Sequence, residues 1–283
     1  SIQLLCRPPI IQTNSLRGRS MTNSDYNAGF LGYGDEEITG FRRENKTLFD
    51  LAEILNKRLI YLTEFCTTNV KESNWHAKAV AVRLLMRSCG LLQAAILLSE
   101  RGMIVEGRTI IRGLLEASFG VAALHDDAEN YIKLLKGDSE ASRRNQLKYL
   151  IEQQLIPKSN SAQNIQTSID NINSKPKLMN QKAIALMGPL GSQYLAYQRL
   201  SDDSVHVTAR SLNHYINLTE DGLGWDYQWL VGDQESVAKN LYTAILASLP
   251  IGLGVAWIID EPAAINDFSE LSRSFHKVEP MII

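Results

Sequence analysis

Two stretches of this sequence are apolar on every face of a helix, and they restrict what the chain can form. Residues 240–259 contain no charged side chain over twenty positions, which is long enough to cross a bilayer. Residues 79–98 are almost as apolar and carry two charges, Arg83 and Arg87. A helix that is apolar all round normally forms the buried centre of a bundle. We therefore expect residues 79–98 to form a core helix and residues 240–259 a core or dimer-interface helix, with a membrane span at 240–259 as the alternative.

Flanking charges and cysteines both favour a cytoplasmic protein. Lys239 precedes the long apolar stretch and Asp260 and Glu261 follow it, so the asymmetry of basic residues is weak. Cys66 and Cys89 lie in apolar, helix-like stretches where buried thiols are usual, and no CxxC pair occurs. This cysteine usage is typical of a reducing compartment. We predict a cytoplasmic protein without a membrane span.

Apolar residues recur at three- and four-residue steps through most of the chain from residue 35 onward. This spacing is typical of amphipathic helices, and no stretch alternates apolar and polar residues over the length of a strand. The sequence therefore predicts an all-α fold, a multi-helix bundle with a long apolar C-terminal helix. The expected helices span residues 36–67, 73–101, 104–124, 127–155, 180–187, 191–202, 204–217 and 233–259.

Composition divides the chain into a lead-in and one helical domain. We expect residues 1–34 to be a flexible lead-in, whose first part is either vector sequence or an upstream in-frame extension. Residues 35–283 are predicted to form a single helical domain. Within that domain, residues 157–180 are polar and lie between two prolines, which indicates an insertion or flap.

Charge and motif content exclude several classes of protein. The 29 Lys and Arg residues nearly balance the 31 Asp and Glu residues, so the chain is not a generally basic nucleic-acid binder. The five histidines form no HExxH motif or zinc-site spacing. No glycine-rich phosphate loop, nucleophile elbow or dinucleotide fingerprint occurs. We predict neither a metal nor a cofactor.

Arginines on two predicted core helices need partners. Arg83 and Arg87 share a helix face with apolar neighbours, and an unpaired buried guanidinium is costly. On the next helix, Arg108, Arg112 and Glu116 follow one another at four-residue steps. Two interpretations are open: an exposed ladder with an Arg112–Glu116 ion pair, or a structural polar network in which Glu116 reaches Arg83 or Arg87.

A second cluster of polar residues lies between positions 199 and 214. On a continuous helix, Arg199, His206 and Arg210 would lie on one face. If Ser204 instead caps a new helix, His206 falls in its first turn, where free N–H groups favour an anion. Either arrangement suits phosphoryl chemistry, with histidine as acid or base and arginine neutralising a phosphodiester.

The alternative for this cluster is an ordinary surface helix. In that case the charges pair locally, Arg199 with Asp203 and Asp202 with His206. On a continuous helix, whichever interpretation holds, the opposite side would face the core through residues Val205, Ala209, Leu212 and Ile216.

Arg199-x6-His206 resembles the R-x4–6-H motif of HEPN domains, although a leucine, Leu200, stands where that motif commonly has a polar residue. Two further motifs are similar to a bacterial all-α family of unknown function that is itself HEPN-like. They are R-x3-R-x3-E-A (Arg108, Arg112, Glu116, Ala117) and Y-x2-L-S-x4-H (Tyr197, Leu200, Ser201, His206). The likeness spans roughly residues 75–217.

The resemblance implies a fold and an activity. HEPN domains are compact all-α bundles that usually dimerise, and many are metal-independent endoribonucleases of phage-defence and toxin–antitoxin systems. By this resemblance His206 would move the proton and Arg199 would stabilise the charge, in a cleft completed by a second subunit. The implied partners are a second copy of the chain, RNA, and a cognate antitoxin or defence-system protein. Candidate RNA- or anion-binding residues are Arg108, Arg112, Arg210 and His214.

A non-catalytic protein is the competing hypothesis. The chain would then be a helical interaction or effector-binding subunit of such a system, and its arginines would form core pairs or an anion-sensing pocket. The geometry of Arg199 and His206 separates the two hypotheses. Convergence on an open cleft favours the nuclease, whereas arginines capped by carboxylates favour the binding subunit.

Overall fold

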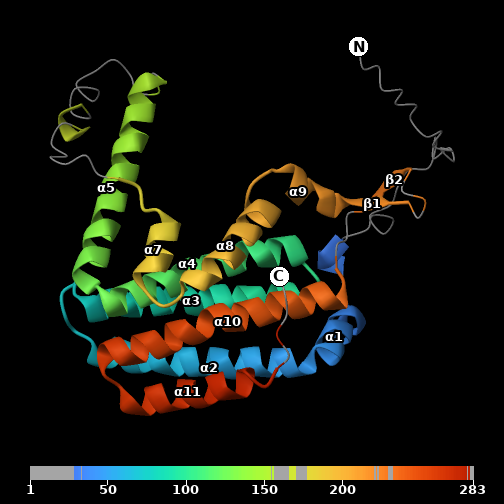
Figure 1. The fold of residues 1–283 in the computed structure, drawn as a ribbon, viewed down its shortest axis with the longest axis horizontal. Coiled ribbons are helices and arrows are strands. Elements are labelled where there is room, and N and C mark those ends of the chain that lie inside the picture. The colour runs from blue at the N-terminus through green and yellow to red at the C-terminus, as the bar shows by residue number, and fades with distance from the viewer. Residues whose placement is uncertain are drawn as a thin grey trace.

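Four long helices lie side by side and form the body of the protein (Figure 1). The structure is a computed structural model that describes residues 29–32, 34–153, 155, 166–169, 177–219, 221, 223–228, 232–278 and 280. Most of the predicted lead-in 1–34 and most of the predicted insertion 157–180 lie outside the described residues. The four helices are α2 (Lys46–Asn69), α3 (Ala77–Glu100), α4 (Ile104–Asp126) and α10 (Gln234–Ile259). The predicted helical bundle is confirmed.

The first predicted helix is in fact two. Helix α1 (Asp35–Glu44) and α2 are separated by Asn45, whose backbone leaves the helical region at φ −112° and ψ 26°. The amide of Asn45 donates hydrogen bonds to the Phe41 carbonyl at 3.2 Å and to Oε1 of Gln234 at 2.8 Å. These contacts attach the break to the start of α10, so a tertiary contact interrupts the helix predicted over residues 36–67.

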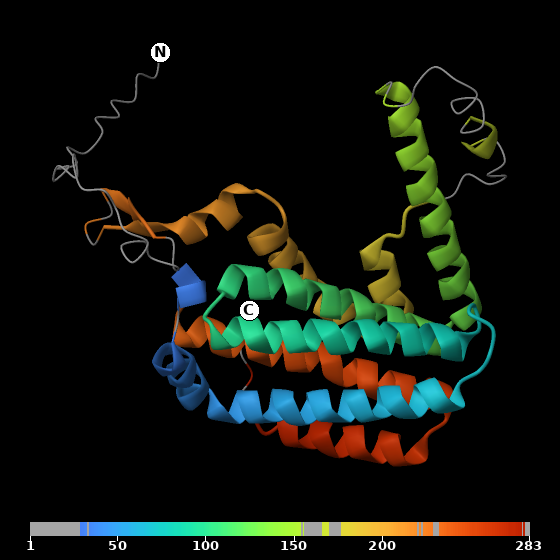
Figure 2. The same cartoon turned by 180° about the vertical axis from the view of Figure 1, so that it is seen from behind.

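Helix α10 is the central element, packed against α2, α3, α4 and α11 (Figures 1 and 2). Its glycines permit close approach of the neighbouring helices. A Cβ on Gly252 would lie 2.3 Å from the ring of Phe268, and one on Gly254 would lie 2.6 Å from Cγ1 of Val121. Most of residues 240–259 are buried in the protein, as predicted, whereas Trp257 is 54% exposed.

Helices α3 and α10 are also long and apolar enough to cross a membrane by length and composition alone. The most apolar window of each helix is 50% and 61% buried inside the protein, respectively. Core helices of soluble bundles are equally long and apolar. The length and composition of α3 and α10 are therefore only weak support for a membrane span.

A last helix was not predicted from the sequence. Helix α10 ends at Asp260, which has a left-handed backbone with φ 63°, and α11 (Pro262–Phe275) follows. Proline at the first position of α11 is favourable, because the first N–H of a helix has no intrahelical partner. Helix α11 runs back along α10 and buries Phe268 and Phe275 against the bundle.

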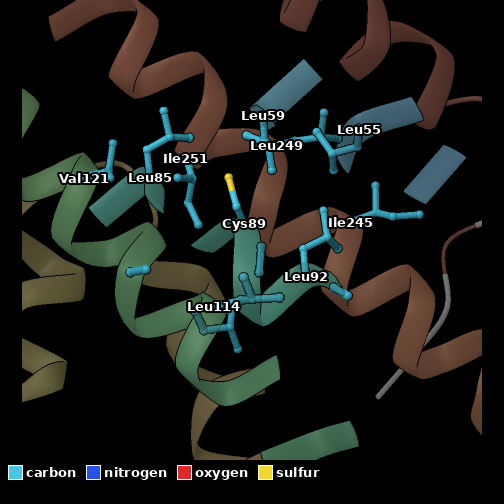
Figure 3. Close-up of a cluster of buried hydrophobic side chains, with 14 of the residues drawn as sticks. Leu55, Leu59, Leu85, Cys89, Leu92, Leu114, Val121, Ile245, Leu249 and Ile251 are labelled. Carbon is cyan, nitrogen blue, oxygen red and sulfur yellow. The ribbon is translucent and has the colours of Figure 1, made fainter. Parts of the chain in front are cut away.

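The hydrophobic core is built from side chains of α2, α3, α4 and α10. Figure 3 shows leucines and isoleucines of these helices around the Cys89 thiol. Cys66 and Cys89 are both buried and unpaired, so the prediction of buried thiols is confirmed. Burial, together with the charge of Glu261, raises the pKa of Cys66 to about 11.

The predicted polar network of Arg83, Arg87 and Glu116 is wrong. Both arginines lie on the exposed face of α3. Arg83 donates to the Asn74 carbonyl and stacks 5.2 Å from the centre of the Trp75 ring. Arg83 shares an open pocket with side chains of a later helix, residues 128–152, but neither arginine is buried, so these guanidinium groups need no buried partner.

The remaining elements extend from one side of the bundle. Helix α5 (Ala128–Glu152) projects away from it, as both ribbon views show. Helix α7 (Gln181–Met187), the short helical turn Gly191–Gln193 and α8 (Tyr194–Leu200) then lead back to α4. The chain finally reaches α9 (Ala209–Leu212), the turn Asn213–Tyr215 and an antiparallel hairpin of β1 (Ile216–Leu218) and β2 (Trp225–Tyr227).

The helix predicted over residues 204–217 is therefore wrong. Ser204 caps no helix, because its hydroxyl donates to the Leu200 carbonyl at 2.7 Å. Thr208 starts α9 instead, and its hydroxyl accepts from the Ser211 N–H at 3.1 Å. Leu212 is 54% exposed, so the face that we expected to pack on the core does not do so.

Candidate anion-binding site

The polar stripe of α4 packs against α8 and the turn that follows it. Arg112 is the centre of this contact. Its guanidinium donates to Oγ of Ser201 at 2.8 Å and to the hydroxyl of Tyr197 at 2.6 Å, and it pairs with Glu116 at 3.0 Å. The guanidinium also stacks 4.7 Å from the centre of the Tyr197 ring. The predicted Arg112–Glu116 ion pair is present, but it is mostly buried rather than part of an exposed ladder.

Tyr197 completes this contact by donating to Glu116. Its hydroxyl lies 3.1 Å from Oε1 of the carboxylate. Burial and the nearby charge of Glu116 raise the pKa of Tyr197, although Arg112 opposes the shift. The phenol therefore stays protonated and remains a donor. Three side chains from two helices thus fix the position of α8 on α4.

Asp203 is the centre of a second cluster, one turn along α4. Its carboxylate pairs with Nη1 of Arg108, with Nε2 of His214 at 2.9 Å and with Nε of Arg210 at 3.3 Å. The side chain of Asp203 is only 12% exposed. Burial by itself raises the pKa of Asp203, but the charges and hydrogen bonds of Arg108 and His214 outweigh it and leave the pKa lowered. The carboxylate is therefore ionised at neutral pH.

A local change of helix geometry puts Asp203 in this position. After α8 the chain forms a π-helical turn over Ser201–Val205, and such turns widen a helix and often occur at functional sites. The hydroxyls of Ser201 and Ser204 donate to carbonyls one turn earlier, at 2.9 and 2.7 Å. Asp203 consequently points inward and is buried, whereas its neighbour Asp202 is exposed.

A pocket of about 230 Å³ lies beside this second cluster. Four of its lining side chains are cationic and one is anionic, so the lining carries an excess of positive charge. We call it the cationic pocket. It is lined by Arg108, Arg199, Leu200, Asp203, Arg210, His214, Lys239, Asn240 and Thr243.

Helix α10 supplies one wall of the cationic pocket. The buried amide of Asn240 donates to the Ile104 carbonyl at 3.1 Å and thereby links α10 to the start of α4. Gly107 permits this contact, because a Cβ there would lie 2.8 Å from Nδ2 of Asn240. Lys239, the preceding residue, pairs with the exposed Glu235 at 2.7 Å and contributes its charge to the pocket.

The structure brings together most of the predicted site residues, but not His206 or Arg112, which contacts Ser201, Tyr197 and Glu116 instead. Arg199, Arg210, Arg108 and His214 all line the cationic pocket. His206 is exposed, has an extended backbone with φ −102° and ψ 146°, and is not part of the lining. The single helix face predicted for Arg199, His206 and Arg210 does not form, because the π-helical turn and an extended segment interrupt the helix.

Sequence reasoning missed the central role of Asp203 and the contribution of α10. Asp203 was expected only as a local partner of Arg199. Lys239 was considered only as a flanking charge of the apolar stretch that begins at Asn240, and only the packing of α10 on α4 brings these two residues to the pocket. Over the described ranges of the chain, no group of three or more His, Cys, Asp or Glu side chains could hold a metal ion.

The region that carries these contacts matches a known family. A family of unknown function, DUF5677, matches residues 78–223, just over half of the chain. The chain belongs to this family. The part that matches DUF5677 runs from α3 to the hairpin and includes the Arg112 and Asp203 clusters, whereas Lys239 and Asn240 lie beyond it. No curated protein and no solved structure matches the chain.

Proposed function

We propose that this protein binds a phosphorylated ligand in the cationic pocket and acts as a helical effector-binding subunit. The observation that carries the proposal is the grouping of Arg108, Arg199, Arg210 and Lys239 around a single buried carboxylate. Guanidinium groups bind phosphoryl oxygens through two parallel hydrogen bonds, which gives geometric specificity as well as affinity. A pocket with excess cations therefore suits an anion.

The mouth of the pocket has a donor that can turn toward a ligand. Arg210 is 60% exposed and its contact with Asp203, at 3.3 Å, is long. Arg108, by contrast, is 14% exposed and is held firmly by Asp203. We therefore assign Arg108 and Asp203 to a fixed floor, and Arg210 and Lys239 to the groups that meet the ligand.

The capping of these arginines favours binding over catalysis. Asp203 already occupies Arg108, Arg210 and His214 as partners, as expected of an anion-sensing pocket. A pocket of about 230 Å³ is smaller than most sites for drug-sized molecules. It suits a phosphoryl group and the part of the ligand that carries this group.

RNA cleavage without a metal is the second candidate function, and the Asp203–His214 contact favours it. Nε2 of His214 lies 2.9 Å from the carboxylate, and with the proton on Nε2 the basic nitrogen would be Nδ1, in the way an aspartate orients a catalytic histidine. That nitrogen would take the proton of a 2′-hydroxyl, whose oxygen attacks the phosphorus. The P–O5′ bond breaks, and the leaving 5′-oxygen takes up a proton from water. Arg199 and Arg210 would neutralise the phosphorane charge.

This form of the nuclease differs from the one implied by the HEPN resemblance. His214 replaces His206 as the base, because His206 is not part of the pocket lining. A homodimer in the cytoplasm, with a cognate antitoxin or defence-system partner, remains part of the proposal for either function. Those parts rest on the resemblance rather than on the geometry of the pocket.

One experiment separates the two functions. Single-stranded RNA oligonucleotides are incubated with the full chain in EDTA, and binding and cleavage are measured on the same samples. Saturable binding without cleavage supports the effector-binding subunit. Cleavage that is lost in His214→Ala and retained in His206→Ala supports the nuclease. Pyrophosphate and nucleotides are titrated into the same protein in parallel. If they and the RNA all fail to bind, both functions are wrong.

A further inference from the structure

A second pocket, of about 370 Å³, opens along α10 and has no part in the proposed function. Its floor is the outward stripe Leu246, Pro250, Leu253 and Trp257, at steps of four, three and four residues. One wall is α11, and the other combines the end of α4 with the segment between α7 and α8. We call it the apolar groove. Its volume falls in the range of small-molecule sites.

One buried polar atom at the apolar groove lacks a hydrogen-bond partner. Oε1 of Gln193, which lines the groove, is buried and has no hydrogen-bond partner in the described part of the chain. Buried acceptors are normally paired, and an unpaired one beside a cavity indicates a ligand that donates to it.

The rim of the groove limits the size of its occupant. His125 and Asp126 lie on one side, with Nδ1 of the histidine 2.7 Å from the carboxylate and 48% and 41% of the two side chains exposed. Ser272 and His276 lie on the α11 side. These polar residues surround the apolar floor. A docked helix or a second subunit would need an apolar surface that extends beyond these walls, so the rim favours a small occupant.

We propose that the apolar groove binds a small amphipathic organic molecule, an aromatic ring or short apolar chain that carries a hydrogen-bond donor. The apolar body packs against Trp257, Phe268 and Leu253, and the donor reaches Oε1 of Gln193. This inference goes beyond the proposed function, since it uses no residue of the cationic pocket. The two sites can therefore be tested separately.

Calorimetric titration with 2-naphthol tests the proposal, and 2-methoxynaphthalene is the matched probe without a donor. We expect saturable binding of one 2-naphthol per chain at sub-millimolar concentration. The methoxy compound binds about tenfold more weakly, which corresponds to the loss of one hydrogen bond. Absence of saturable binding, or equal affinity for the two compounds, would overturn the proposal.

Three variants locate the binding. Leu253→Trp fills the groove and lowers the affinity for 2-naphthol at least tenfold, while Leu97→Trp, at an exposed position of α3, leaves it unchanged. Gln193→Leu removes the preference for the donor compound. If circular dichroism shows that Leu253→Trp does not fold, the Gln193→Leu variant decides alone. If that variant still binds 2-naphthol more tightly than 2-methoxynaphthalene, the proposal is overturned.

Light scattering identifies the competing occupant. A second copy of the chain in the groove would make the wild type a dimer that Leu253→Trp converts to a monomer, and that result also overturns the proposal. A wild type and a Leu253→Trp variant of the same mass, with different affinities for 2-naphthol, support it.

Discussion

Nε2 of His214 lies 2.9 Å from the Asp203 carboxylate, which also pairs with Arg108 on α4. One buried carboxylate therefore holds the segment after α8, the segment before the hairpin and the middle of the central bundle together. The same carboxylate sets the balance of charge in the cationic pocket. Stability and ligand binding are thus linked through Asp203.

Asp203→Asn lowers the stability of the fold. The substitution leaves the guanidinium of Arg108, 14% exposed, without its counter-charge, and breaking a buried pair in this way costs about 3 kcal/mol. Urea denaturation measures the change. Asp226→Asn, on an exposed strand residue, is the control and leaves the unfolding midpoint unchanged. Equal midpoints for the two variants would show that the Asp203 cluster contributes little.

The same carboxylate gives the stability of the protein a pH dependence. The pKa of Asp203 is lowered in the folded state, so its contribution is complete above the unfolded-state pKa of about 4. It is lost as the pH falls through the lower folded-state pKa. Between about pH 5 and pH 2 the wild type therefore loses more stability than Asp203→Asn. If the wild type and Asp203→Asn give parallel curves of unfolding free energy against pH, Asp203 is not ionised in the folded protein as assigned.

Tyr197→Phe destabilises the contact between α4 and α8. The change removes the hydroxyl that donates to Glu116 and accepts from Arg112, at a cost of about 1 kcal/mol. Tyr227→Phe, at a tyrosine that is 81% exposed, is the matched control. Thermal unfolding of both variants measures the difference, and a Tyr197→Phe midpoint equal to that of Tyr227→Phe would argue against the contact.

Cys66 and Cys89 react slowly with thiol reagents in the folded protein. Burial raises the pKa of both thiols, that of Cys66 to about 11, so the reactive thiolate is scarce at pH 8 and is shielded by the core. Mass spectrometry after iodoacetamide treatment measures labelling at each site, with urea-unfolded protein as the reference. Labelling of both cysteines at equal rates in folded and unfolded protein would contradict the packing of α2 and α3.

His214 and His206 differ in their effect on ligand binding. His214→Ala alters the cationic pocket and weakens phosphate or RNA binding severalfold, because it removes a partner of Asp203. His206→Ala changes an exposed side chain that is not part of the pocket lining and leaves the affinity unchanged. Filter binding of a labelled oligonucleotide compares the two. A larger loss of affinity in His206→Ala than in His214→Ala would instead support the active site expected from the HEPN resemblance.

Periodicity alone located the main helices to within a few residues at most ends. The predicted helix at 104–124 is α4 (Ile104–Asp126), and the one at 233–259 is α10 (Gln234–Ile259). Their apolar faces are long and continuous, so local spacing is sufficient. The burial of Cys66 and Cys89 could be predicted for the same reason.

Features that depend on distant contacts could not be predicted in this way. Arg83 and Arg87 have apolar neighbours on a helical wheel, but both side chains are exposed, and Arg83 only shares an open pocket with α5. The break after α8 depends on serine hydroxyls and on the pairing of Asp203 with Arg108, which spacing along the chain does not reveal. The cationic pocket combines α4, α8 and α10, and sequence periodicity does not show which helices are neighbours.

Titration with pyrophosphate at low salt tests the central claim most directly. The wild type binds one anion per chain, more weakly as salt is added, because charge attraction dominates the interaction. Arg210→Glu places a second carboxylate beside Asp203 and lowers the affinity at least tenfold. Arg87→Glu, an equal charge change on the exposed face of α3, leaves it unchanged. Equal affinity of Arg210→Glu and Arg87→Glu, or no saturable binding by the wild type, would contradict an anion site in the cationic pocket.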